Sequence, residues 1–199
     1  FCQIPTEKLE LWNDFARIKY RNELKKDGKY FGARERTLWD CESSLYPEFG
    51  LIVCISYAID DRNIHSLTAP DASDEFELLN RFADGLRQNR HHLLCAHNGK
   101  GFDFHWIISR MVIHGIKLPF MLQVQGMKPW ELPFRDTQEM WGFGDNRRTV
   151  RLDVLCHCLG VESPKDAMCG SEVPQAWRDG RIEEIQEYCE KDVAAMREC

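Results

Sequence analysis

Hydrophobic and polar positions alternate with two different periods along the chain, and the period in each segment indicates a strand or a helix. Residues 50–59 are almost wholly apolar and predict a buried strand, and its hairpin partner is expected at 64–69. Apolar positions three or four apart predict a helix from about 76 to 88. A further strand is expected at 91–98, followed by a helix that ends at Gly115. Strands and helices therefore alternate, which indicates an α/β fold.

The two ends of the chain are expected to be mainly helical. Residues 7–46 are highly charged, and their apolar positions repeat at helical spacing, so we expect a helical excursion there. A short strand is expected at 133–137. Three helices are expected after it, at 150–160, at about 171–178 and at 181–197.

Composition places the chain among ordinary globular proteins, and we expect one domain over residues 1–199. Hydrophobic residues make up 43% and charged residues 29%, which is enough apolar content for a buried core. The longest apolar run, residues 51–59, is too short to span a bilayer, and no secretion signal is visible. The nine cysteines are odd in number and irregularly spaced, which favours reduced thiols. We therefore expect a soluble, cytoplasmic protein.

The formal net charge of −6 argues against a protein that holds nucleic acid by bulk electrostatic attraction. It does not exclude a nucleic-acid enzyme, because a site that gathers carboxylates around divalent cations is itself acidic. Cys156, His157 and Cys158 lie together, but residues two apart on a helix face different directions. Small core side chains are therefore a better interpretation of these cysteines than a zinc site.

The first candidate for chemistry is Asp103, at the end of the segment HNGKGFD. This segment follows an apolar strand and opens a helix, and sites in open α/β sheets usually lie at the carboxyl ends of strands. The helix dipole also favours an acidic residue in a first turn, so a purely structural role has equal weight. Gly99 and Gly101 would let backbone approach a phosphate, but the Walker and G-x-G-x-x-G patterns are absent.

The second candidate is the pair Tyr188 and Asp192 in the segment EYCEKDV, residues 187–193. In a helix the two side chains lie one turn apart on one face. An ordinary amphipathic helix with a solvated acidic face is the alternative, and it accounts for the neighbouring glutamates. It does not account for the pair together with Asp103. A carboxylate beside a phenol that orients or deprotonates water suits hydrolysis at a metal-bound phosphodiester.

Several separated segments resemble one known family. In chain order they are SLYPEFG at 44–50, IVCIS at 52–56, AHNGKGFD at 96–103, KPWE at 128–131, DT at 136–137, SPKD at 163–166 and EYCEKDV at 187–193. Together they look like the predicted 3′ to 5′ exonucleases related to the proofreading domain of family-B DNA polymerases, within the DEDD superfamily. The resemblance runs from about residue 44 to the end of the chain.

The resemblance implies an α/β, ribonuclease H-like fold with a mixed sheet flanked by helices. It also implies hydrolysis at the 3′ end of single-stranded DNA by two ions, Mg²⁺ or Mn²⁺, held by four carboxylates. Residue by residue, Asp103 matches the second family motif, and Tyr188 and Asp192 match the third, where the Tyr marks the DEDDy branch. Asn98 and Lys165 lie in family-like segments and are expected to contact the substrate.

The first family motif, a D-x-E on the first strand that supplies two of the carboxylates, is absent from its expected place. In relatives it precedes a segment like residues 7–46, so we expect it upstream of Phe1. Asp40-Cys41-Glu42 is an alternative D-x-E, but the apolar stretch before it is short for a buried strand. With only Asp103 and Asp192 the second ion would lack its ligands, so the activity of residues 1–199 alone is in question.

Two other functions fit the same residues. One is a catalytically inactive module of the same fold that binds nucleic-acid ends, and the other is an exoribonuclease, because the choice of sugar depends on pocket shape. Arg147, Arg148 and Arg151 are candidates for phosphate contacts, although a solvated loop is more typical of such a segment. Trp130 and Phe102 are candidates for stacking on a base, but we expect both in the core.

Overall fold

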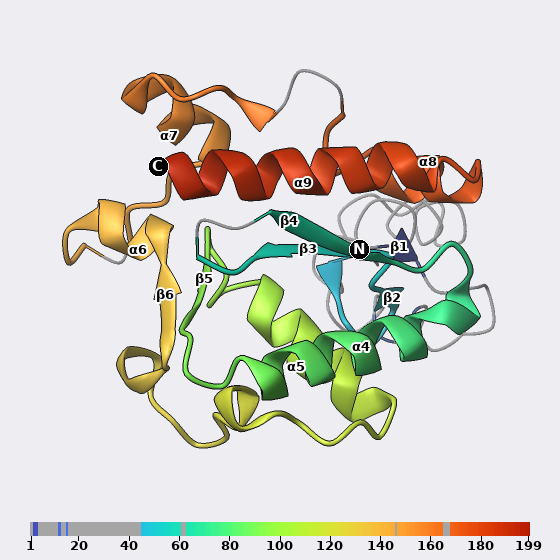
Figure 1. Ribbon diagram of the computed structural model, residues 1–199. Coiled ribbons are helices and arrows are strands. Elements are labelled where there is room, and N and C mark those ends of the chain that lie inside the picture. The colour runs from blue at the N-terminus through green and yellow to red at the C-terminus, as the bar shows by residue number, and fades with distance from the viewer. Residues whose placement is uncertain are drawn as a thin grey trace, which may run out of the picture.

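The computed structural model describes residues 2–3, 12, 15, 45–60, 63–145, 147–164 and 168–199. In these residues the chain has the predicted α/β architecture of the ribonuclease H-like kind, in which short strands are flanked by helices (Figure 1). Most of the helical excursion predicted for 7–46 lies outside the described residues. The same holds for Lys165 and for the alternative motif at Asp40 and Glu42.

Two strand pairs form the centre of the fold. Strand β3 (Cys54–Ala58) pairs antiparallel with β4 (Ile64–Thr68) and forms the predicted hairpin. Strand β5 (Leu94–Ala96) runs parallel to β6 (Phe134–Asp136), so the carboxyl ends of both strands meet at one edge. In the described part of the chain, no strand is paired with the remaining edge of β3 or of β5.

The apolar run at 50–59 is broken into two strands, where one strand was predicted. Strand β2 (Gly50–Leu51) pairs antiparallel with β1 (Cys2–Gln3), and β3 begins only at Cys54. Between them, the backbone N–H of Ile52 donates to the Glu75 carboxylate at 2.7 Å instead of to a strand. A tertiary contact therefore interrupts the strand that the apolar pattern predicts.

Helices cover both faces of the β3–β4 hairpin. Helix α9 contacts β3 and β4 on one face, and α4 lies against the opposite face beside α5 (Figure 1). Helix α6 was not predicted. The helices are α4 (Glu75–Gln88), α5 (Asp103–Ile113), α6 (Thr137–Gly142), α7 (Leu152–Leu159), α8 (Val173–Arg178) and α9 (Ile182–Glu198), with single 3₁₀ turns at Ala72–Asp74, Phe120–Leu122 and Pro129–Glu131. None of the helices in the described residues is both long and apolar enough to cross a membrane.

Two apolar clusters fill the space between these layers. The larger one lies between the strands and helices α4 and α5, and it includes the fully buried Leu79 and Met111. The smaller one packs α8 and α9 against the segment before β3, and Tyr188 lies at its border. Trp130 belongs to neither cluster and is 79% exposed, so the prediction that it lies in the core is wrong. Phe102 packs against the larger cluster, as predicted.

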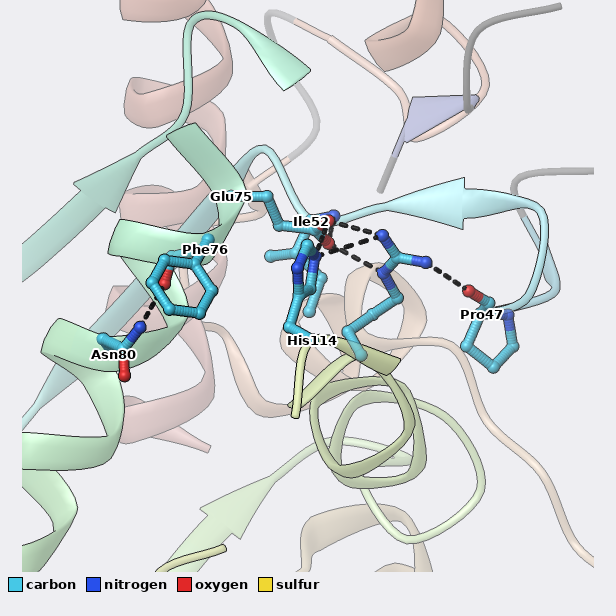
Figure 2. Close-up of polar contacts among 7 residues, drawn as sticks. Pro47, Ile52, Glu75, Phe76, Asn80 and His114 are labelled. Carbon is cyan, nitrogen blue, oxygen red and sulfur yellow. Dashed lines mark hydrogen bonds and ion pairs between the residues drawn. The ribbon is translucent and has the colours of Figure 1, made fainter. Parts of the chain in front are cut away.

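A buried charged cluster centred on Glu75 joins α4, α5 and the segment before β3 (Figure 2). Glu75 is 1% exposed, and its two oxygens accept hydrogen bonds from Ile52, from the Arg110 guanidinium and from His114. Arg110 also donates to the carbonyl oxygen of Pro47 at 2.9 Å. Burial alone would raise the pKa of Glu75, but the hydrogen bonds and charge of Arg110 hold it below its ordinary value.

Candidate functional site

The loop between β5 and α5 carries three of the residues singled out from the sequence. Asp103 is the first residue of α5, where the strand end meets the helix, as the segment HNGKGFD predicts. Asn98 is exposed at the start of the loop and has a left-handed backbone, with φ of 59°. His97, before it, bonds Thr137 Oγ1 at 2.9 Å and the Val150 carbonyl at 2.7 Å. Because a carbonyl can only accept, His97 donates from Nε2 and accepts the Thr137 hydroxyl at Nδ1.

Asp136 holds this loop in place from the neighbouring strand. Its side chain is 3% exposed, and it accepts hydrogen bonds from the backbone N–H groups of Asn98 at 2.9 Å and Lys100 at 3.0 Å. It also accepts from the Gln138 N–H at 3.0 Å and so caps helix α6. Two of these donors belong to the loop and the third to α6, so this one carboxylate joins the loop to β6 and to the start of α6.

Close packing explains the first of the two glycines of the loop. A Cβ atom on Gly99 would lie 2.5 Å from the Cβ of Ala96 and 2.8 Å from the Phe104 ring. A Cβ atom on Gly101 would lie 2.7 Å from the Asn98 side-chain oxygen. Glycine is therefore required at position 99 for the loop to fold against β5 and α5, whereas at position 101 the exposed Asn98 side chain could move aside.

The predicted pair Tyr188 and Asp192 lies on one face of α9, and the two side chains are hydrogen-bonded to each other. The helix is anchored at Glu190, between these two residues, because Glu190 accepts hydrogen bonds from Ser66 of β4 at 2.7 Å and from Gln186 at 2.8 Å. Glu190 is therefore partly buried and hydrogen-bonded. The alternative interpretation of this helix, a solvated acidic face, predicts an exposed carboxylate at this position. The contact of Glu190 with Ser66 fixes the rotation of α9 about its axis, and with it the direction of Tyr188 and Asp192.

The fold brings Asp103 close enough to Asp192 for their charges to interact, although Asp192 lies 89 positions later in the chain. Burial raises the pKa of Asp103 to about 6, and the negative charges of Asp192 and Asp136 add to this rise. Burial and the adjacent Asp192 also raise the pKa of the Tyr188 phenol well above its ordinary value. The phenol is therefore protonated at neutral pH and donates its hydrogen to the Asp192 carboxylate.

Carboxylate oxygens are the donors that Mg²⁺ and Mn²⁺ prefer, so Asp103 and Asp192 suit a divalent cation. Asp136 is less suitable, because its oxygens already accept three backbone donors. Across the described ranges, no group of three or more His, Cys, Asp or Glu side chains forms a metal site. These residues therefore fit the partial coordination of one ion and do not fit two.

Sequence reasoning had not singled out the roles of Asp136 and Glu190 in positioning these groups, whereas it had placed His97 beside Asn98 as a positioning residue. A signal for Asp136 does exist, because Asp is a favoured helix N-cap and this one ends a predicted strand. No comparable signal marks Glu190, whose partner Ser66 is 124 positions away. Cys156 is buried, whereas His157 and Cys158 beside it are exposed. Lys165 is outside the described residues, so its role stays a prediction.

Comparison with known proteins gives one matching family model, described as a predicted 3′-5′ exonuclease related to the exonuclease domain of PolB, over residues 46–196. The chain is 27% identical over 169 residues to a DNA polymerase of Desulfurococcus sp. (strain Tok). It is 26% identical over 168 residues to a DNA polymerase of Pyrococcus glycovorans. Each of these matches covers 75% of this chain and 22% of the polymerase, so the chain spans about a fifth of their length.

A smaller relative matches over most of its length. An uncharacterized protein of Methanocaldococcus jannaschii is 26% identical over 160 residues, which cover 78% of this chain and 85% of that protein. The region of this chain that matches the family model, residues 46–196, contains Asp103, Tyr188 and Asp192.

Proposed function

Because the chain belongs to the family of predicted 3′-5′ exonucleases related to the exonuclease domain of PolB, we propose that it hydrolyses phosphodiester bonds at the 3′ end of single-stranded DNA. The observation that carries this proposal is the convergence of Asp103 and Asp192 from two distant elements, with Tyr188 bonded to the second carboxylate. Two partly buried carboxylates near each other are unfavourable unless a cation offsets their charge.

In this proposal Asp103 and Asp192 hold a divalent cation, Mg²⁺ or Mn²⁺, at the carboxyl end of β5. When bound, such a cation stabilises negative charge on the phosphate and favours deprotonation of a bound water. Tyr188 has a positioning role, because a phenol with a raised pKa that donates to Asp192 is a poor base at neutral pH. It orients the Asp192 carboxylate and the attacking water. Asn98, exposed on the loop, contacts the terminal nucleotide, and Lys165 is proposed to do the same.

A complete two-ion centre needs two more carboxylates. We propose that they come from a strand that joins β3 to β5, because both strands have an edge without a paired strand in the described residues. Tyr57 of β3 and Leu94 of β5 line one common hollow, so the two strands lie near each other. A D-x-E upstream of Phe1 is the proposed source, and Asp40 with Glu42 is the alternative.

The test is the Mn²⁺-dependent release of mononucleotides from a single strand that carries a label at its 3′ end. Two chains are compared: residues 1–199, and the same chain extended upstream of Phe1. Release by the extended chain alone supports an upstream D-x-E, and release by both chains favours Asp40 and Glu42. If neither chain releases nucleotides, or if Asp192→Asn leaves release unchanged, the proposed hydrolysis is wrong.

Two alternatives share this fold, and each has its own measurement. An inactive module that binds nucleic-acid ends would bind Mn²⁺ weakly or not at all in calorimetric titration, whereas the proposed enzyme binds it through Asp103 and Asp192. An exoribonuclease would release nucleotides faster from a single-stranded RNA than from a DNA of the same sequence, because a pocket that fits the sugar distinguishes the 2′-hydroxyl.

A further inference from the structure

Two large aromatic side chains are exposed at the end of helix α6. Trp141 is 39% exposed and Phe143, just after the helix, is 86% exposed. Their ring centroids are 6.1 Å apart and their planes are inclined at 49°. Adjacent rings exposed to water are a common mark of a binding surface, because neither ring contributes its full area to the core.

The backbone at Phe143 holds its side chain away from the core. Phe143 ends α6 in the left-handed region, with φ of 49°, and its N–H donates to the Met140 carbonyl. A bulky residue rarely adopts this conformation, and glycine would be the usual choice at the end of a helix. Such outliers persist where the surrounding structure holds them, and they gather at binding and active sites.

Both ends of the segment that carries these rings are held beside the candidate site. His97 bonds Thr137, the first residue of α6, and also the carbonyl of Val150. Gln138 donates to the same Val150 carbonyl at 3.0 Å. Thr137 and Val150, at the two ends of this segment, therefore both lie beside His97. His97 directly precedes Asn98 in the loop that leads to Asp103.

Three arginines accompany the rings. Arg147, Arg148 and Arg151 have side chains that are 89%, 76% and 70% exposed. The backbone of Arg148 lies against Gly142, between the two rings in sequence, because a Cβ atom there would be 3.9 Å from the Arg148 carbonyl oxygen. The arginines pair with Asp145 and with Asp153. Exposed ion pairs contribute little stability, so these guanidinium groups can exchange a carboxylate partner for a phosphate.

We propose that this aromatic and arginine surface, formed by Trp141, Phe143, Arg147, Arg148 and Arg151, docks the single-stranded nucleic acid whose 3′ end reaches the candidate site. The inference rests on the proposed function of that site and adds the surface that holds the strand. Aromatic rings stack on bases of any sequence, and arginines contact the phosphates between them. The rings alone would also suit an apolar protein partner, but three arginines beside them in a chain of net charge −6 favour a polyanion.

The experiment measures binding without cleavage. Fluorescence anisotropy follows a 5′-labelled oligothymidylate of about ten nucleotides, a length typical of single-strand sites, in the presence of EDTA. The double variant Trp141→Ala with Phe143→Ala should weaken binding by about tenfold or more, because each ring loses one stacked base. The double variant Arg147→Ala with Arg148→Ala should reduce the slope of log Kd against log salt concentration by about 1.4, or about 0.7 for each lost phosphate contact.

Phe76 and Phe120 provide a matched control. They are 49% and 83% exposed, close to the 39% and 86% of Trp141 and Phe143, and neither lies in the segment 137–150. The double variant Phe76→Ala with Phe120→Ala should bind the oligonucleotide as the unmodified protein does. Because Trp141 and Phe76 are partly packed, both aromatic double variants should lose some stability, so anisotropy is measured well below the Tm of every variant. Equal weakening by the control pair would overturn the proposal, and so would unchanged binding in the Trp141 and Phe143 variant.

The outcomes separate this proposal from the proposed function. If the unmodified protein binds the single strand through Trp141 and Phe143 but releases no nucleotide when Mn²⁺ is added, the hydrolysis is wrong and the docking surface stands. If nucleotides are released at equal rates, at substrate concentrations below Kd, with and without the two rings, the docking surface is wrong and the hydrolysis stands. A blunt duplex that binds as tightly as the single strand also overturns the docking proposal, because its bases are not free to stack.

Discussion

Replacing Asp136 with Asn tests whether one buried carboxylate holds the loop that carries Asn98 and Asp103. The change keeps the size of the side chain and turns one acceptor oxygen into an NH₂ donor. Three backbone N–H groups point at this side chain: Oδ1 accepts those of Asn98 and Gln138, and Oδ2 accepts that of Lys100. An amide can serve the first two through its oxygen, but its NH₂ group then faces the Lys100 N–H.

The size of the effect follows from these contacts. Leaving the Lys100 N–H without an acceptor in a partly buried place costs about 1–3 kcal/mol. The two remaining bonds lose their charged acceptor, which costs about 1 kcal/mol each. The expected loss in the free energy of unfolding is about 4 kcal/mol, and for a chain of this length it lowers Tm by about 10 °C. A displacement of Asp103 of about 1 Å would reduce the rate of nucleotide release about a hundredfold.

Urea unfolding followed by circular dichroism measures the first quantity, and release from a 3′-labelled strand measures the second. Glu139→Gln is the matched control, because Glu139 lies in the helix that Asp136 caps and bonds Lys100 Nζ at 2.6 Å. The Glu139 side chain is 50% exposed, so water can replace it, and its loss should cost less than about 1 kcal/mol. A loss below 1 kcal/mol in Asp136→Asn, or an equal loss in Glu139→Gln, would refute the view that Asp136 holds the loop.

Three further predictions concern the buried charges and the candidate cation. Glu75→Gln should lower the free energy of unfolding by about 3–5 kcal/mol at neutral pH, because Arg110 is left buried without a counter-charge. The lowered pKa of Glu75 means that its contribution is present above its ordinary value of 4.5 and is lost as the pH falls below it. Urea midpoints of wild type and variant should therefore converge in acid, and a constant gap would contradict this. Saturating Mn²⁺ should raise Tm by about 5–10 °C in scanning fluorimetry, and a rise that persists in Asp192→Asn would contradict the proposed ligand. Tyr188→Phe should keep that rise but slow nucleotide release about tenfold or more; unchanged release would exclude a positioning role.

Local patterns in the sequence account for most elements of the fold. The hairpin of β3 and β4, the helices α4 and α5 and the terminal helix α9 follow from strong periodicity over five residues or more. Helix α6 has six residues, which is too short for a periodic signal, and its start depends on the Asp136 cap. The break before β3 has no local signal, because it depends on the contact between Ile52 and Glu75, 23 positions apart.

The candidate site was partly predictable for a related reason. Asp103 and the pair Tyr188 and Asp192 are marked by their places at a strand end and along one helix face, which spacing reveals. Asp103 and Asp192 influence each other's charge only because α9 packs on the hairpin, and spacing in the sequence does not reveal that packing. Exposure of Trp130 was predicted wrongly, because aromatic residues are buried on average and nothing in KPWE indicates a surface turn.

The buried and partly buried carboxylates of the described residues are of two kinds, which the sequence does not distinguish. Glu75 and Asp136 are both less than 5% exposed, and the protein itself supplies hydrogen-bond donors to each. Glu75 accepts from a guanidinium, a histidine and a backbone N–H. Asp136 accepts from three backbone N–H groups. Burial raises the pKa of Asp103, and the neighbouring carboxylates of Asp192 and Asp136 add to this rise. A hydrogen-bond donor of the protein stabilises a carboxylate without a cation, whereas a neighbouring carboxylate destabilises it until a cation binds. The number of donors around each carboxylate therefore decides where a metal ion would bind, more than the net charge of the chain does.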